Sequence, residues 1–81
     1  MTNKILITGG AGHIGGALAR RLVENSKNYL TIVDDLSTGS QSKLPSKKFK
    51  NFEFIKADVN NLESLKNSIY NKKFDFVFHY A

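Results

Sequence analysis

Short apolar runs recur along the chain at two different periods. Four runs are rich in β-branched and aromatic residues, as strands are: Lys4–Thr8, Tyr29–Asp34, Phe52–Lys56 and Asp75–Tyr80. In and beside the last two runs, phenylalanines occupy alternating positions, which predicts that they face a core: Phe52, Phe54, Phe74, Phe76 and Phe78. The pattern therefore predicts four strands separated by longer connections.

Between the first two runs the apolar spacing changes to that of a helix. From His13 to about Glu24, residues three or four positions apart predict one apolar face: Ile14, Ala17, Leu18, Leu22 and Val23. A second helix is predicted over Leu62–Tyr70, with Asn61 as its cap. Residues 35–51 have no clear period and contain the only proline, so we expect a surface loop with room for one helical turn.

Strands that alternate with helices predict parallel β-α-β units with right-handed crossovers. The fourth run has no charge apart from Asp75 and no proline, and a single residue follows it. Such a strand is prone to aggregate when it forms an exposed sheet edge. We therefore expect residues 1–81 to be a truncated, N-terminal part of a larger domain.

Composition narrows the class of protein. The 81 residues suffice for one small domain, and 41% hydrophobic against 23% charged residues is the balance of a soluble globular chain. The sequence has no cysteine, no apolar run of membrane-spanning length and no signal peptide in MTNKILITGG. We expect a cytoplasmic protein with no metal site and no membrane partner.

The net charge of +5 comes from 12 Lys and Arg residues against 7 Asp and Glu residues. Much of the excess falls in two predicted loops, at Lys43, Lys47, Lys48 and Lys50 and at Lys72–Lys73. Only one aromatic residue, Phe49, is interleaved with these lysines, which is too few for a surface that stacks on bases. We therefore interpret them as solvated loop residues and expect no nucleic-acid partner.

Three glycines at spacing G-x-x-G-x-x-G, Gly9, Gly12 and Gly15, lie directly between the first strand and the first helix. A tight strand-to-helix turn needs a residue that tolerates positive φ. A backbone that approaches a pyrophosphate needs a residue without Cβ, and the last glycine allows close packing of the helix. The first helical turn then offers unpaired N–H groups and a positive dipole end to phosphates.

Asp34 ends the second predicted strand, 19 positions past Gly15. A carboxylate at this place accepts hydrogen bonds from an adenosine ribose, and its charge disfavours the 2′-phosphate of NADP. Since no arginine lies immediately beside Asp34 in the sequence, these residues predict NAD as the cofactor. The alternative is that Asp34 or Asp35 only caps the following turn.

Four motifs, TGGAGHIGG, VDDLSTG, KADV and DFVFHYA, occur in this order over essentially the whole chain. Together they resemble the N-terminal part of the extended short-chain dehydrogenases/reductases, in particular the NAD-dependent nucleotide-sugar epimerases and dehydratases. These include UDP-glucose 4-epimerase-like and UDP-glucuronate decarboxylase-like enzymes. The resemblance implies the first half of a Rossmann fold, an α/β fold whose parallel sheet has about four strands in the order 3-2-1-4 with flanking helices. It also implies bound NAD, a nucleotide-sugar substrate and a homodimer for the complete protein.

The resemblance also implies roles for individual residues along the cofactor. The pyrophosphate would meet the loop glycines and the backbone N–H groups after them: Gly9, Gly12, His13, Ile14 and Gly15. The adenosine ribose would be held by Asp34 and wrapped by Asp35, Leu36, Ser37, Thr38 and Gly39. Asp58 would bond the adenine amino group with Val59 beside the ring, and Tyr80 and Ala81 would line the nicotinamide half. The competing interpretation of Asp58 is an ordinary turn residue.

Two residues depart from the usual family pattern. His13 stands where phenylalanine or tyrosine is common, and Asp35 stands where asparagine is common. If only its backbone is used, His13 is a mild change, whereas its imidazole would add a donor or a pH-sensitive charge near the pyrophosphate. Asp35 adds negative charge and further disfavours NADP. For His79 we expect a hydrogen bond to backbone rather than an acid or base role.

The Tyr-x-x-x-Lys element by which these enzymes place their acid/base tyrosine is not found in this sequence. Four residues after Tyr29 and Tyr70 stand Val33 and Phe74, and the sequence ends one residue after Tyr80. We therefore expect the chain to be the NAD-binding segment of an epimerase or dehydratase and not to be catalytic by itself. The alternative is a stand-alone module that binds NAD or adenine nucleotides without catalysis.

Overall fold

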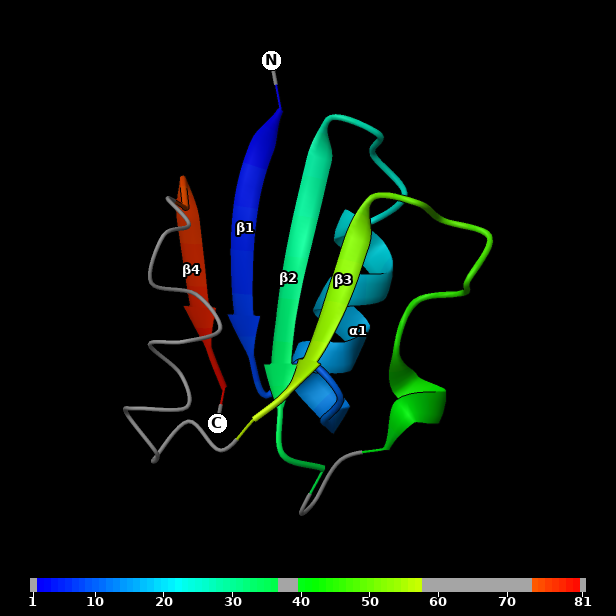
Figure 1. The fold of residues 1–81 in the computed structure, drawn as a ribbon, viewed down its shortest axis with the longest axis vertical. Coiled ribbons are helices and arrows are strands. Elements are labelled where there is room, and N and C mark those ends of the chain that lie inside the picture. The colour runs from blue at the N-terminus through cyan, green and yellow to red at the C-terminus, as the bar shows by residue number, and fades with distance from the viewer. Residues whose placement is uncertain (1, 37–39, 58–73, 81) are drawn as a thin grey trace.

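The computed structural model describes residues 2–36, 40–57 and 74–80, and within them the chain forms one parallel sheet (Figure 1). Its strands are β1 (Asn3–Thr8), β2 (Asn28–Asp34), β3 (Phe52–Lys56) and β4 (Phe76–His79). They lie side by side in the order β3-β2-β1-β4, and every neighbouring pair is parallel. The predicted strand order is confirmed, and each predicted strand is present to within one residue at either end.

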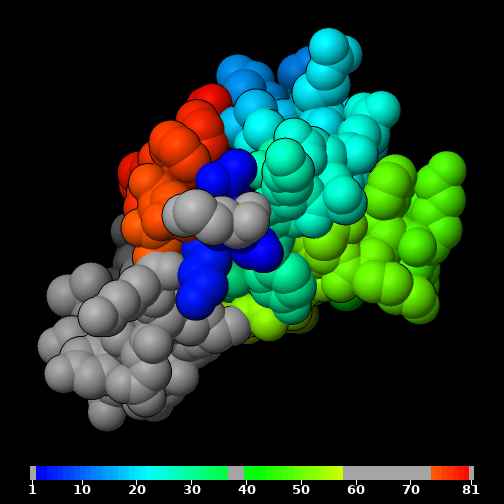
Figure 2. Space-filling model, turned by 90° about the horizontal axis from the view of Figure 1, so that it is seen from above, coloured from blue at the N-terminus to red at the C-terminus, as the bar shows by residue number. Residues whose placement is uncertain are grey.

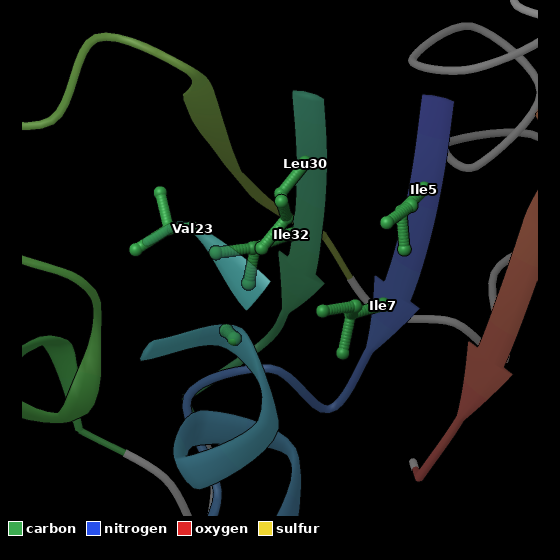
Figure 3. Packing of buried hydrophobic residues seen from close by; sticks show 6 residues of the cluster. Ile5, Ile7, Val23, Leu30 and Ile32 are labelled. Atoms are coloured by element: carbon green, nitrogen blue, oxygen red, sulfur yellow. The ribbon is translucent and has the colours of Figure 1, made fainter. Parts of the chain in front are cut away.

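The single described α-helix, α1 (His13–Leu22), covers one face of the sheet. Between them lies a core cluster of Ile5, Ile7, Ala19, Val23, Leu30 and Ile32 (Figure 3). These strand residues alternate along β1 and β2, so their side chains point to the same face. Burial of this cluster fixes α1, and with it the loop that precedes the helix, against β1 and β2.

The predicted apolar face of α1 is confirmed at Leu22 and Val23, which contribute to the core, and is wrong at Ile14 and Ala17. The residues buried within the helix are Gly15, Gly16 and Ala19, whereas Ile14 is 63% exposed and Ala17 is also exposed. Small residues on the inner face allow the helix backbone to come close to the loop and the sheet, so bulk is not the criterion for burial here. The helix also ends at Leu22 rather than Glu24, because Glu24 and Asn25 donate to Arg21 and Leu22 in a turn.

The opposite face of the sheet carries a smaller cluster of Leu6, Val33 and Ala57, against which Ile55 and Phe74 pack. Four of the five phenylalanines predicted to face a core are partly buried against the two clusters: Phe52, Phe54, Phe74 and Phe78. Phe76 does not follow the prediction, since it is 52% exposed on β4, whose one neighbouring strand among the described residues is β1. Sheet position therefore overrides the alternation at this residue.

The long connection between β2 and β3 contains a short 3-10 helix, η1 (Gln41–Lys43), which confirms the expected helical turn. Ser40 begins it, and the hydroxyl of Ser40 accepts a hydrogen bond from the N–H of Ser42. The predicted second helix, over residues 62–70, lies outside the described residues. Among the helices that are described, none is long and apolar enough to cross a membrane.

At the amino ends of the strands, the turn after α1, the start of β2 and the segment before β3 come together (Figure 2). The Asn51 side-chain amide donates to the carbonyls of Val23, Asn25 and Asn28, at 2.9, 3.3 and 2.8 Å. The Asn28 amide in turn donates to the carbonyl of Leu22 at 2.9 Å. Asparagine side chains thus satisfy the backbone carbonyls at this end of the molecule.

Candidate functional site

The candidate site lies at the opposite end, where the carboxyl ends of β1, β2 and β4 meet (Figure 1). The chain leaves β1 through a tight loop whose first residue, Gly9, has φ 74°, a conformation that favours glycine. The N–H of Gly9 donates to the carbonyl of Val33 at 2.7 Å, and the N–H of Gly12 donates back to Gly9 at 3.0 Å. The loop is therefore tied to β2 and folded on itself before the helix begins.

The glycines of this loop are required for different physical reasons. A Cβ on Gly15 would stand closer than 3.0 Å to the Gly9 carbonyl oxygen, so this glycine lets α1 pack directly on the loop backbone. A Cβ on Gly10 would collide in the same way with the Ile32 side chain of β2. Gly12 is different, because a Cβ there would meet only the Gly9 oxygen, at 3.2 Å. Packing within the protein therefore requires glycine at positions 10 and 15 more strictly than at position 12.

The amino end of α1 offers backbone donors to an anion. Gly12 caps the helix without a side-chain hydrogen bond, and the first turn contains no acidic residue. In the described part of the chain, the N–H groups of His13, Ile14 and Gly15 have no hydrogen-bond partner, as expected for the first turn of a helix. His13 and Ile14 are exposed. Unpaired donors and the positive end of the helix dipole together suit a phosphate group.

Asp34, at the end of β2, faces this loop and is only 7% exposed. Its Oδ2 accepts a hydrogen bond from the N–H of Ala11 at 2.9 Å, and its Oδ1 accepts from the N–H of Leu36 at 2.8 Å. Asp34 therefore does cap the following turn, as the alternative interpretation had it, and it also holds the glycine loop. Since each carboxylate oxygen can accept two hydrogen bonds, both retain acceptor capacity for a ligand hydroxyl.

Leu36 has φ 65°, which is uncommon for a residue other than glycine, asparagine or aspartate. Its N–H group is the one that Asp34 holds. Strained backbone of this kind persists where the surroundings fix it, and it gathers at ligand sites. The turn after β2 is therefore held in a particular shape directly beside the carboxylate.

At the end of β4, His79 and Tyr80 contact the last residue of β1. The Nδ1 of His79 and the hydroxyl of Thr8 form a hydrogen bond at 2.5 Å, and the N–H of Tyr80 donates to the carbonyl of Thr8 at 2.9 Å. The prediction that His79 bonds to backbone was wrong in its partner, which is a side-chain hydroxyl. Tyr80 is exposed next to the glycine loop, at the switch point between β1 and β4 where ligands of open parallel sheets bind.

Comparison with known proteins places this geometry in a family. The family model described as "NAD dependent epimerase/dehydratase family" matches residues 5–81. The chain belongs to this family. It is 32% identical over 82 residues to a UDP-glucose 4-epimerase of Streptomyces lividans, covering 100% of this chain and 23% of that protein. It is 46% identical over 59 residues to UDP-glucuronic acid decarboxylase 3 of Arabidopsis thaliana, covering 69% and 17%.

Among solved structures, the Bordetella bronchiseptica enzyme WbmH in complex with NAD+ superposes with a TM-score of 0.87 and 26% identity. The superposition covers 100% of this chain and 26% of WbmH. The chain thus spans about a quarter or less of the length of these relatives. The family assignment and the Rossmann-type strand order agree with the expectation from the sequence.

Several of the residues that the resemblance implies for the cofactor site lie together at one end of the sheet: Gly9, Gly12, Gly15, Asp34 and Tyr80. Asp35 is exposed beside them. Six of the predicted cofactor residues lie outside the described residues: Ser37, Thr38, Gly39, Asp58, Val59 and Ala81. Reasoning from spacing missed Gly10 and Ala11, which shape the site through contacts with Ile32 and Asp34. It also missed the bond between Thr8 and His79 beside the site. Only the double glycine at 9–10 signalled one of them.

Proposed function

We propose that this chain binds NAD, with the pyrophosphate at the start of α1 and the adenosine ribose on Asp34. The observation that carries the proposal is the convergence of unpaired N–H groups at His13, Ile14 and Gly15 with a nearly buried carboxylate held by the same loop. Gly12 fits the proposal because glycine there leaves room for a ligand rather than for another part of the protein.

The charges around Asp34 favour NAD over NADP. The Asp34 carboxylate is fixed by two backbone donors, and Asp35 follows it on the exposed side of the turn. The 2′-phosphate of NADP would bring a third negative charge to this place. In the described residues the guanidinium of Arg20 is bonded to the carbonyl of Lys43 rather than to either aspartate. We therefore expect discrimination against NADP.

In the complete enzyme we propose a nucleotide sugar as the substrate. NAD supplies a hydride acceptor for oxidation of a sugar hydroxyl, which permits epimerisation, dehydration or decarboxylation before hydride returns. The residues of this chain would hold the cofactor for that chemistry. The Gly9–Gly15 loop would neutralise and orient the pyrophosphate, Asp34 would fix the ribose, and Tyr80 would border the nicotinamide half.

Calorimetric titration of the 81-residue chain with NAD and NADP tests the proposal. We expect NAD to bind and NADP to bind at least tenfold more weakly, since one misplaced charge costs about 1.4 kcal/mol or more. In Gly12→Val a branched side chain occupies the pyrophosphate position and NAD binding is lost. The matched control is Ala17→Val, one turn further along α1 at an exposed position.

Circular dichroism would establish that both variants are folded. Normal NAD affinity in folded Gly12→Val would show that the pyrophosphate does not bind at this loop. A folded wild-type chain without affinity for NAD would contradict the proposal as a whole.

A further inference from the structure

The turn that follows Asp34 has both of its ends tied to one residue of the glycine loop. At one end, the Asp34 carboxylate accepts from the N–H of Ala11 at 2.9 Å. At the other end, the N–H of Ser40 donates to the carbonyl of Ala11 at 3.0 Å. Ala11 itself is fully buried, so it is a fixed point for both contacts. The position of Ser40 and the position of the carboxylate are therefore linked through a single residue, Ala11.

The segment that begins at Ser40 is held at a second point, by Arg20 in the last turn of α1. The Nη1 of Arg20 donates to the carbonyl of Lys43 at 2.5 Å, at the end of η1. Close to this bond, a Cβ on Gly16 would stand 3.2 Å from both the Cβ and the carbonyl oxygen of Lys43. The absence of a side chain on Gly16 thus lets η1 lie against the helix where Arg20 reaches it. Figure 1 shows η1 beside the lower part of α1, towards the carboxyl ends of the strands.

We propose that Arg20 is a positioning residue for the adenosine half of the cofactor, although it belongs to the outer surface of α1. Arg20 holds η1 through Lys43, Ser40 caps the start of η1, and Ser40 is bonded to the same residue that orients Asp34. Loss of the Arg20 bond frees the segment that begins at Ser40, whose N–H group bonds to Ala11. The inference rests on the proposed binding of NAD and adds to it a residue that does not touch the ligand.

The neighbouring arginine provides a matched control. Arg21 is exposed like Arg20 and lies in the same last turn of the helix. Within the described part of the chain, the Arg21 guanidinium makes no hydrogen bond. Arg20→Met and Arg21→Met remove the same charge and the same number of donors. Any difference between the two variants therefore reports the bond to Lys43 rather than net charge or helix propensity.

The first measurement compares ADP, which carries ribose and pyrophosphate, with inorganic pyrophosphate alone. In Arg20→Met we expect ADP affinity to fall about three- to tenfold, the range for loss of one hydrogen bond that orders a binding loop. Pyrophosphate affinity should change less than about twofold, because the start of α1 is unaltered. Arg21→Met should leave both unchanged, and Arg20→Lys should recover most of the loss because an ammonium group can donate to the same carbonyl.

The second measurement is amide hydrogen exchange without ligand. Exchange at residues 40–44 should be faster in Arg20→Met than in Arg21→Met. Equal exchange in the two variants, equal ADP affinity, or equal losses for ADP and pyrophosphate would each overturn the role given to Arg20. A folded wild-type chain that binds neither NAD nor ADP would overturn the proposed function, and the role of Arg20 towards the ribose with it.

Discussion

The two ends of the sheet treat their backbone polar groups in opposite ways. At the amino end, the Asn51 amide serves three carbonyls around the end of α1, and the Asn28 amide serves that of Leu22. At the carboxyl end, the described chain leaves the first N–H groups of α1 without partners. At its carbonyl end α1 thus has partners within the protein, namely side-chain amides for Leu22 and Val23 and backbone N–H groups for Ala19 and Arg21, whereas the described residues provide none at its N–H end.

This difference separates the residues of this small protein that stabilise the fold from those that are available to bind a ligand. Unpaired donors at a helix terminus are satisfied by side chains, water or ligands. The residues beside the unpaired donors are glycines, a fixed carboxylate and a strained turn, which add little packing of their own. The amino end, in contrast, has no strained residue among those described. Substitutions at the two ends should therefore affect folding and ligand affinity to different degrees.

The largest effect on stability is expected from Gly15→Ala. The added Cβ would press on the Gly9 carbonyl oxygen, which is backbone and cannot move aside without displacing the loop. We expect a loss of about 3 kcal/mol in the free energy of unfolding, as for overpacking of a rigid site. Gly12→Ala is the matched variant, because φ at Gly12 is −83° and a Cβ there has more room. Its loss should stay below about 1 kcal/mol.

Urea denaturation of both variants measures this pair. NAD titration supplies the second measurement. Gly12→Ala should reduce the free energy of NAD binding by more than it reduces the free energy of unfolding. Equal destabilisation by the two alanines would mean that the loop relaxes around either residue, and the distinction between packing and ligand glycines would be wrong.

The next largest effect is expected at the amino end, from Asn51→Ala. This variant leaves three carbonyls without their common donor, two of them bonded at 2.9 and 2.8 Å. We expect a loss of about 2 kcal/mol in the free energy of unfolding, because partly buried acceptors lose their bonds together. Asn25→Ala, in the turn after α1 that Asn51 contacts, loses one exposed bond to the N–H of Lys27 and should cost about 0.5 kcal/mol.

NAD affinity of folded Asn51→Ala should equal that of the wild-type chain. A drop in affinity that exceeds the drop in folded fraction would show that the two ends are coupled, and the comparison between them would not hold.

The strands were predictable from the sequence because each one is marked by a local run of apolar, β-branched and aromatic residues. Each of the four strands and their order agree with the predictions, as does the turn at residues 41–43. The inner face of α1 was not predictable from apolar periodicity, because Gly15 and Gly16 are buried for their lack of bulk. The prediction that Phe76 faces a core failed for a related reason, because alternation does not distinguish a strand with two neighbours from a strand with one.

The candidate site likewise contains some residues that the sequence predicts and others that it does not. Gly9, Gly12, Gly15 and Asp34 follow from spacing along the chain, which reports a strand, a turn and a helix in order. Ala11 and Thr8 carry no such signal, because their importance comes from Asp34 and His79, which are distant in sequence and adjacent in space. A single sequence specifies these contacts only through the folded sheet.

The smallest effect is expected from Thr8→Val, which removes the hydroxyl bonded to the imidazole of His79 while keeping the shape of the side chain. Valine fits the buried position of Thr8 in β1, and the exposed His79 ring can bond to water instead. We therefore expect a loss of about 1 kcal/mol or less in the free energy of unfolding. This bond lies at the carboxyl end, yet it joins two groups of the protein itself, as the bonds at the amino end do. If it serves only to join β1 to β4, NAD affinity in Thr8→Val stays within about twofold of the wild-type value. A tenfold loss of affinity at unchanged stability would instead make the Thr8–His79 pair part of the binding site, because only a contact that shapes the ligand's surroundings lowers affinity without lowering stability.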